Sequence, residues 1–343
     1  MKKTTLSLLT IFALAFNAKA QNIQDFFLAN TEDASKLTSA YMAPAMKGLV
    51  YSMNNGWYHT AKVHKKFGFD ISIGANASFV PAKDEIFNIS SLGLKGLTFP
   101  NGAAIPEGAT SPTIAGGDDA IPARLGISVI ADGTTINTPI EISLPKGADL
   151  PVNAVPAPSV QVGLGLPYKF DVMLRLVPKV GTDDAKGSVW GLGLKKEFTD
   201  LLSPLGKTPL HLSFLAAYTN MSVDYNFTEN STQITTDNAN AQFRLNAYTV
   251  QAIASINFPI INFYGGLGYN GGNTKVNMLG DFNLNYGGGV VDTITDPVSV
   301  KNNTGSFNAT IGTRLSLGFF KIFGSYTMQE YNSVNAGIAF SFR

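Results

Sequence analysis

Long runs in which apolar and polar residues alternate constrain the fold of this chain more than any other feature. In residues 305–319 the odd positions from Phe307 to Phe319 are apolar except Thr313, and the even positions are polar or small. Successive side chains of a strand point to opposite faces of a sheet. The pattern therefore predicts strands with one apolar and one polar face.

The length of these runs favours a membrane barrel over a soluble sheet protein. Strands of globular proteins average about 5–6 residues, whereas strands that cross a bilayer need about 9–11. The polar faces are rich in Gly, Ser, Asn and Thr, which is typical of a wet or plugged lumen. A large secreted β-sandwich, whose strands also alternate, is the alternative. The predicted strands cover residues 48–59, 67–80, 158–166, 167–177, 188–197, 209–225, 243–258, 260–276, 305–319, 320–329 and 332–343.

Short and long connections follow one another between these strands, as in outer-membrane barrels, which have short periplasmic turns and longer outer loops. The short ones lie at 166–168, 258–260 and 319–321, and the longer ones at 179–187, 226–240 and 278–304.

Residues 82–157 fit the strand pattern least, because most of this stretch is rich in Gly, Pro and Ala. We interpret it as a long outer loop or inserted flap that hides at least one more strand, with 124–131 and 139–144 as candidates. Bacterial single-chain barrels have even strand numbers. The sequence therefore predicts an all-β fold: a transmembrane antiparallel β-barrel of 12–14 strands.

The first twenty residues have the features of a secretory signal peptide. Lys2 and Lys3 precede an apolar run over 8–16, and Ala18-Lys19-Ala20 fits the cleavage pattern. The apolar run is far shorter than the ~20 residues that span a membrane. We predict cleavage near Ala20 and location in the outer membrane of a Gram-negative bacterium.

Residues 21–47 do not alternate and are predicted to form an N-terminal helical plug segment before a barrel over 48–343. Apolar residues recur at helical spacing within 33–42, including Leu37 and Tyr41. Pro44 is expected to end this helix, because proline disfavours the helical conformation of the residue before it. Two interpretations stay open: a plug inside the lumen, or a periplasmic stub.

The stretch over 33–45, with 54–58, 258–260 and 264–269, resembles the long-chain fatty-acid transporter-like barrels. It is more similar to a family of unknown function from the outer membrane of Bacteroidota that is related to them. The resemblance implies fourteen strands, an N-terminal plug and passage of hydrophobic compounds.

The composition excludes several classes of protein. The chain has a net charge of +1, only 14% charged residues and no Cys. A near-zero net charge gives no footprint for nucleic acid, and the lack of Cys excludes disulfide scaffolds and thiol chemistry.

Few residues suggest chemistry, and we predict no enzyme, cofactor or metal site. His59 and His64 lack a visible third metal ligand and are expected in a solvated turn. His211 and Ser213 share one strand face, but no nucleophile motif surrounds Ser213, so both are expected to line the lumen.

Charged residues on the inward faces are the candidate functional residues. In a lumen they would pair, hold a plug or form a polar constriction; a ladder of ion pairs that stiffens the wall is the alternative. This predicted lumen charge cluster contains Asp70, Lys169, Asp171, Arg175 and Arg314, and the plug helix contributes Leu37, Tyr41 and Pro44.

Two functions remain open. The first is passive transport of small hydrophobic solutes across the outer membrane. The second is a structural or secretion-accessory barrel whose long outer loops bind other proteins. Both imply contact with outer-membrane lipid. Both also imply recognition by the barrel-assembly machinery of the C-terminal strand, where Ile338, Phe340 and Phe342 face one way.

Overall fold

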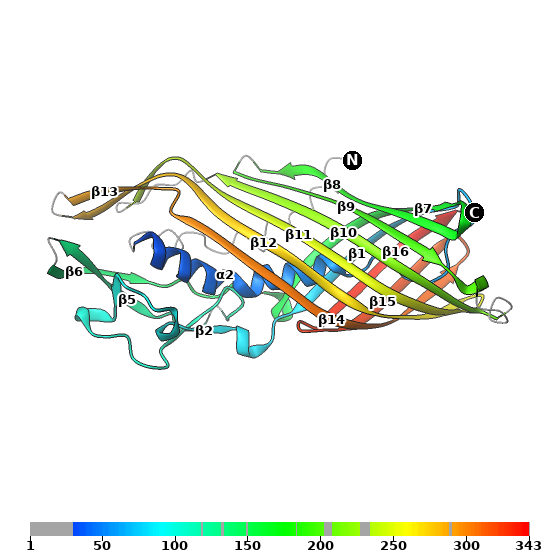
Figure 1. Ribbon diagram of the computed structural model, residues 1–343, viewed down its shortest axis with the longest axis horizontal. Coiled ribbons are helices and arrows are strands. Elements are labelled where there is room, and N and C mark those ends of the chain that lie inside the picture. The colour runs from blue at the N-terminus through cyan, green and yellow to red at the C-terminus, as the bar shows by residue number, and fades with distance from the viewer. Residues whose placement is uncertain are drawn as a thin grey trace.

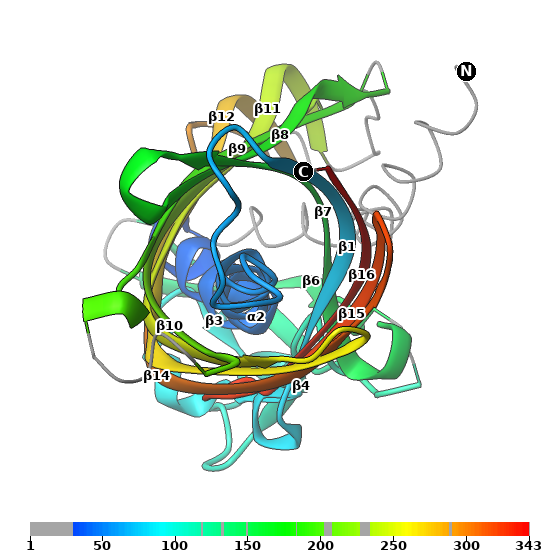
Figure 2. The same cartoon turned by 90° about the vertical axis from the view of Figure 1, so that its right-hand side faces the viewer.

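A closed antiparallel ring of strands dominates the computed structural model (Figures 1 and 2). The structure describes residues 30–342 except 118, 132–133, 149, 183, 202–207, 227–233 and 288–289. The predicted signal peptide and the cleavage position near Ala20 lie outside the described residues. Within them the main sheet has eleven strands, and pairing of β11 with β12 closes it. The strands are β1 (Phe69–Phe79), β7 (Ala154–Leu166), β8 (Phe170–Gly181), β9 (Ala185–Glu197), β10 (Leu210–Asn226), β11 (Ile234–Asn257), β12 (Ile261–Gly287), β13 (Val290–Thr295), β14 (Val298–Leu317), β15 (Phe320–Met328) and β16 (Ser333–Phe342).

The class of fold predicted from the alternation is confirmed, but the strand number is lower than 12–14. Among the described residues β13 pairs only with β12, beyond the point where β14 begins, so ten of the eleven strands form the ring. The predicted outer loop over 278–304 is wrong, because it is largely strand. The candidates within 82–157 are strands, β5 (Arg124–Ala131) and β6 (Thr134–Ser143), but they belong to a separate sheet with β3 (Leu97–Thr98).

The predicted first strand over 48–59 is also wrong, because a single helix, α2, runs from Thr31 to Asn54. Pro44 lies inside this helix and does not end it. Near the proline, which cannot donate a hydrogen bond, the carbonyl of Tyr41 accepts one from the backbone N–H of Ile114 at 3.0 Å. Contacts from the rest of the chain thus stabilise a helix that its local sequence disfavours. Among the described residues, no helix is both long and apolar enough to cross a membrane.

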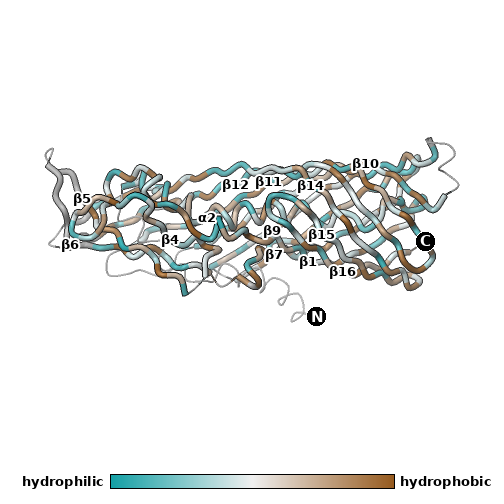
Figure 3. The backbone as a smooth tube through the Cα atoms, turned by 90° about the horizontal axis from the view of Figure 1, so that it is seen from below, coloured by the Kyte–Doolittle hydropathy of each residue, from teal (hydrophilic) through white to brown (hydrophobic). Residues whose placement is uncertain are grey.

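The outer face of the ring carries a belt of exposed apolar side chains. Hydrophobic and hydrophilic residues alternate along the strands of the ring (Figure 3). Aromatic rings lie along one edge of the belt: Trp190 contacts Tyr218 at 5.5 Å between centroids, and Tyr269 contacts Phe307 at 5.4 Å. Such rings mark the interfaces of membrane barrels. Other residues of the belt include Ile71, Leu164, Leu174, Leu192, Phe214, Val250, Leu267, Ile311 and Ile322.

Beyond this belt β11, β12 and β14 continue; we call their outer parts the projecting strands. In these parts the polarity of the two strand faces is reversed. Along β14 the outward residues change from Ile311 and Phe307 to Asn303 and Lys301, while the inward residues change from Asn308 to the buried Val300. β11 and β12 change in the same way. An apolar outer face suits lipid and a polar one suits water, so the reversal marks the level at which the membrane ends.

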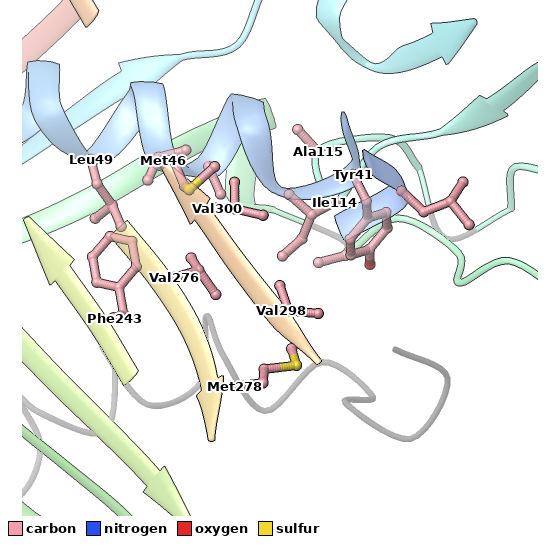
Figure 4. Close-up of a cluster of buried hydrophobic side chains, with 14 of the residues drawn as sticks. Tyr41, Met46, Leu49, Ile114, Ala115, Phe243, Val276, Met278, Val298 and Val300 are labelled. Atoms are coloured by element: carbon pink, nitrogen blue, oxygen red, sulfur yellow. The ribbon is translucent and has the colours of Figure 1, made fainter. Parts of the chain in front are cut away.

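The projecting strands and an inserted segment enclose the first half of α2. The insertion, between β1 and β7, contains β2 (Ile86–Asn88), β4 (Thr110–Pro112), the sheet of β3, β5 and β6, and the 3₁₀ turns Ala82–Asp84, Ser90–Leu92, Pro100–Gly102 and Pro151–Asn153. Figure 4 shows part of the resulting core, in which Tyr41, Met46, Leu49, Ile114, Ala115, Phe243, Val276, Met278, Val298 and Val300 are labelled.

The start of α2 is fixed to the insertion by a buried carboxylate. Asn30 caps the helix by accepting a hydrogen bond from the backbone N–H of Asp33. The Asp33 carboxylate accepts hydrogen bonds from the backbone N–H groups of Lys95, at 3.0–3.1 Å, and Gly96, at 2.7 Å. These bonds join the helix to the insertion.

Ile311→Lys should destabilise the barrel by about 2–4 kcal/mol, because it places a charge in the lipid belt. Asn303→Lys is the matched control: the same face of β14 is outside the belt there, next to the native Lys301, and the expected change is below about 0.5 kcal/mol. Denaturant titration of both variants folded into phospholipid vesicles gives the comparison. An equal loss of stability in the two variants would show that the lipid belt does not end between these positions.

Candidate functional site

The N-terminal segment occupies the lumen, which makes the lumen the candidate site. Looking along the ring, Figure 2 shows α2 inside it. After Asn54 the chain continues without regular structure through residues 55–66, which we call the lumen coil, and reaches β1 after a turn at Phe67, whose φ is +61°.

Arg175 of β8 binds the junction between α2 and the lumen coil. Its Nη1 and Nη2 donate to the carbonyls of Met53 at 2.9 Å and Asn55 at 2.7 Å. Its Nε donates to Gln161 at 3.0 Å, and its guanidinium stacks over the Trp57 ring at 3.9 Å. The buried charge is thus satisfied by main-chain carbonyls and a ring face, an arrangement suited to a planar guanidinium.

An apolar cluster lies next along the coil, around Trp57 and Tyr58. A side-chain Cβ at Gly193 of β9 would approach the Trp57 ring to 3.0 Å, so any larger residue there would require the indole to shift by a few tenths of an ångström. The Tyr58 hydroxyl donates to Gln251 at 2.9 Å. The cluster contains Trp57, Tyr58, Ala61, Met173, Leu215, Ala217, Ile253 and Tyr264.

Two aspartates of the wall hold the histidines of the coil. His59 Nε2 lies 3.1 Å from Asp70 Oδ2, and His64 Nδ1 lies 3.2 Å from Asp171 Oδ2. Asp171 also accepts from the His64 backbone N–H at 3.0 Å and pairs with Lys195 Nζ at 3.1 Å. Each buried carboxylate therefore faces donors, as buried charges require.

Arg314 of β14 fixes the tautomer of His59. Its Nη1 lies 3.0 Å from His59 Nδ1. A guanidinium can only donate, so Nδ1 accepts and Nε2 carries the proton that it donates to Asp70. His59 also stacks on Phe323 at 4.9 Å. Arg314 of β14 and Asp70 of β1 thus hold His59 between them against β15.

Other coil contacts use main-chain groups. The backbone N–H of Val63 donates to Glu197 at 3.0 Å, and that of Ala61 donates to Ser255 at 3.0 Å. The Ser213 hydroxyl donates to the Ala61 carbonyl. His211 pairs with Glu197 at 2.7 Å.

The structure brings together four of the five residues predicted for the lumen charge cluster: Asp70, Asp171, Arg175 and Arg314 lie on the inner wall against the coil. Lys169 is a correction. It lies in the 3₁₀ turn Pro167–Lys169, where it is exposed and pairs with Asp200.

The expected solvated turn at His59 and His64 is also wrong, because His59 is 8% exposed and both rings contact buried aspartates. Leu37 and Tyr41 are buried in the core around α2, where the Tyr41 hydroxyl donates to the Lys146 carbonyl at 2.8 Å. Three further residues of the site, Gln161, Lys195 and Glu197, were not predicted from the sequence. The available signal was their position on the polar face of alternating runs.

A second polar contact joins α2 to the connection between β15 and β16. Lys47 Nζ lies 2.7 Å from Glu330 Oε1, and the Tyr51 hydroxyl donates to Oε2 at 2.6 Å. Partial burial raises the pKa of Glu330, but the hydrogen bonds from Lys47 and Tyr51 outweigh it, and the pKa lies below its usual value. The ionised carboxylate is therefore the form that stabilises this contact.

The closed ring, the lipid belt and the occupied lumen define the chain as an outer-membrane β-barrel with an internal N-terminal segment. Residues 1–342 match a family model described as a family of unknown function (DUF6588), and the chain belongs to that family. Among the described residues, no cluster of three or more His, Asp or Glu has an arrangement that could hold a metal ion.

Similar solved structures include three bacterial proteins. Ail of Yersinia pestis is 12% identical, with 81% of this chain and 100% of that chain covered and a TM-score of 0.27. The translocator domain of NalP from Neisseria meningitidis is 10% identical (89% and 97% covered, TM-score 0.31). The outer membrane protease OmpT of Escherichia coli is 10% identical (81% and 99% covered, TM-score 0.33). No curated protein matches the chain.

Asp171→Asn should destabilise the barrel by about 3–5 kcal/mol, because it leaves Lys195 buried without its carboxylate. Asp200→Asn removes the same group from the exposed pair with Lys169 and should cost less than about 1 kcal/mol. Thermal or denaturant unfolding in detergent compares them. A small cost at Asp171 would contradict the role of this pair in holding the coil.

Glu330→Gln should lower stability by about 1 kcal/mol at neutral pH, and this difference should shrink as the pH falls below the unfolded-state pKa. The lowered pKa means that the carboxylate stabilises the fold above the unfolded-state value of 4.5 and that this contribution is lost as the pH falls through the folded-state pKa. Unfolding of wild type and variant across this range measures the difference. A difference that persists at low pH would argue against the ionised contact.

Proposed function

We propose that this protein allows passive passage of small hydrophobic solutes across the outer membrane, with the lumen coil as its gate. One observation carries the proposal: within the described residues, no backbone-to-backbone hydrogen bond joins residues 55–66 to a strand of the ring. Side-chain contacts hold the coil instead, from Arg175, Glu197 and Ser255. Such contacts can break singly while the strand pairing of the barrel stays intact.

The residues around the coil support a hydrophobic solute. Trp57, Tyr58, Leu215, Ile253 and Tyr264 form the apolar cluster at the centre of the lumen. If the coil moves, the wall side chains of this cluster face the vacated space. Kinship with the long-chain fatty-acid transporter-like barrels and an origin in Bacteroidota are part of the proposal, and the helix inside the ring is consistent with the first.

The proposal includes no catalytic step. The Ser213 hydroxyl, which shares a strand face with His211, already donates to the Ala61 carbonyl. The proposed partners are lipid around the apolar belt and the assembly machinery at β16, whose apolar Ile338, Phe340 and Phe342 end the chain's last strand.

A structural or secretion-accessory role is the second candidate, and one feature favours it. The insertion, the projecting strands and the first half of α2 share one apolar core (Figure 4). This gives the outer end a rigid extension that a simple pore would not need, and such an extension offers a surface for docking.

A disulfide between the coil and the wall tests the gate. The hydroxyl oxygens of Thr60 and Ser255 lie 3.2 Å apart, and the chain has no Cys, so Thr60→Cys with Ser255→Cys forms a single defined pair. Oxidation should reduce uptake of a small apolar solute by proteoliposomes at least about tenfold, and reduction should restore it.

The controls are the single variant Thr60→Cys and the pair Ser52→Cys with Ser78→Cys. The latter fixes the end of α2, where the two hydroxyl oxygens lie 2.8 Å apart, and leaves the coil untied. The single variant should take up solute under both conditions. Equal uptake by the oxidised and reduced Thr60–Ser255 pair would contradict gating by the coil. No uptake by any form, wild type included, would favour the docking role.

A further inference from the structure

Three cations stand side by side on the outward face of the projecting strands. Arg244 of β11 is opposite Lys275 of β12, and Lys275 is opposite Lys301 of β14. We call these residues the basic row. Their outward direction follows from their neighbours, because the adjacent Leu245, Val276 and Val300 are buried in the core around α2.

The basic row is only partly neutralised by protein. Arg244 Nη2 pairs with Asp224 Oδ1 at 2.6 Å, and Asp224 is shared with Lys179 at 3.4 Å. Lys186 of β9 also lies opposite Asp224. Lys275 and Lys301 make no ion pair among the described residues. The next carboxylate along β12, Asp281, lies six residues beyond Lys275, or about 20 Å along the strand.

Like charges directly opposite one another destabilise a sheet. Neighbouring strands lie about 4.8 Å apart, so the two lysines without carboxylates repel each other across β12 and β14. An anion that binds both would remove this cost and add charge-assisted hydrogen bonds. The row is thus arranged for a ligand with more than one negative charge.

The height of the basic row relative to the membrane indicates where the anion lies. Each residue of the basic row lies beyond an aromatic residue of the lipid belt on the same strand face: Arg244 is four residues from Tyr248, and Lys275 and Lys301 are six residues from Tyr269 and Phe307. The aromatic edge marks the membrane interface. Six residues rise about 14 Å above it on a strand tilted by about 45°, and the long cationic side chains bend back over part of this height. The projecting end is opposite the short turns and therefore lies on the outer side.

We propose that the basic row binds the phosphate groups of the anionic glycolipid in the outer leaflet. The site is formed by Lys275 and Lys301, with Arg244 held in place by Asp224. It lies outside the barrel and is independent of whether solutes cross the lumen. Attraction to lipid phosphates orients the barrel and fixes its depth in the outer leaflet.

The test uses the full mature chain in detergent micelles, with diphosphoryl lipid A as the probe. Lys275→Gln with Lys301→Gln should weaken lipid A binding roughly 20- to 30-fold, since each cation near an anionic lipid contributes about 1 kcal/mol. The matched control, Lys66→Gln with Lys321→Gln, removes two charges at the short-turn end and should bind lipid A like wild type.

Stability without lipid A separates binding from a structural role. Because the lysines repel each other, the Lys275–Lys301 double variant should be at least as stable as wild type in lipid-free detergent. It should lose the rise in melting temperature that lipid A gives to wild type. Dephosphorylated lipid A should give no rise in either protein.

Three results would overturn the proposal. The first is an equal shift by lipid A in wild type and double variant. The second is an equal shift by dephosphorylated lipid A, which would mean that acyl chains alone are recognised. The third is the same stabilisation by millimolar inorganic phosphate as by lipid A, which would show a site for a free anion.

Discussion

Satisfaction of backbone hydrogen bonds in a medium without water is the constraint on which this structure depends. A sheet can cross lipid only if it has no open edge, and here the pairing of β11 with β12 closes it. Closure then determines the polarity of the side chains on each face, because one face of each strand meets lipid and the other meets an enclosed space. Where β11, β12 and β14 pass beyond the lipid, the constraint ends and the faces reverse, with polar residues outside and Val276, Val300 and Phe243 inside.

The reversal explains how one helix can serve two environments. The first half of α2 packs in an apolar core shared with the insertion and the projecting strands, as a helix does in a soluble protein, and Met46, Leu49 and Val50 of its second half belong to the same core. Only the end of the helix and the lumen coil meet the polar inner wall, where Arg175 donates hydrogen bonds and Asp70 and Asp171 accept them. Buried charges contribute little net stability when paired but cost much when a partner is lost. They therefore fix the path of the coil more than they stabilise the barrel, which is compatible with the proposed gate.

Residue patterns predicted the ring because its driving force is local to each strand. Apart from residues 48–59, each predicted strand overlaps a strand of the ring. Four of the five charged residues assigned to the lumen lie on its inner wall. The errors share a cause. Ala43-Pro44 and Gly48 disfavour a helix by local propensity, yet α2 continues through them because its side chains are buried in the surrounding core and Ile114 supplies a hydrogen bond from outside. Glycine is required at position 48, since a Cβ there would approach Val155 to 2.6 Å. Lys169 has the expected spacing but falls in a turn, and the histidines of the coil needed their distant aspartates to be recognised as buried.

The sequence by itself determined that this chain is a lipid-facing barrel. Apolar and polar residues alternate along strands long enough to cross a bilayer, and this alternation indicates which face of each strand meets hydrocarbon. It also determined that Asp70, Asp171, Arg175 and Arg314 face inward. Only the tertiary structure decided that ten strands suffice, that residues 55–66 fill the lumen, and that Arg244, Lys275 and Lys301 form one row. Those features depend on register and on contacts between residues far apart in the chain. Alternation specifies the face of each side chain but not its neighbour on the next strand.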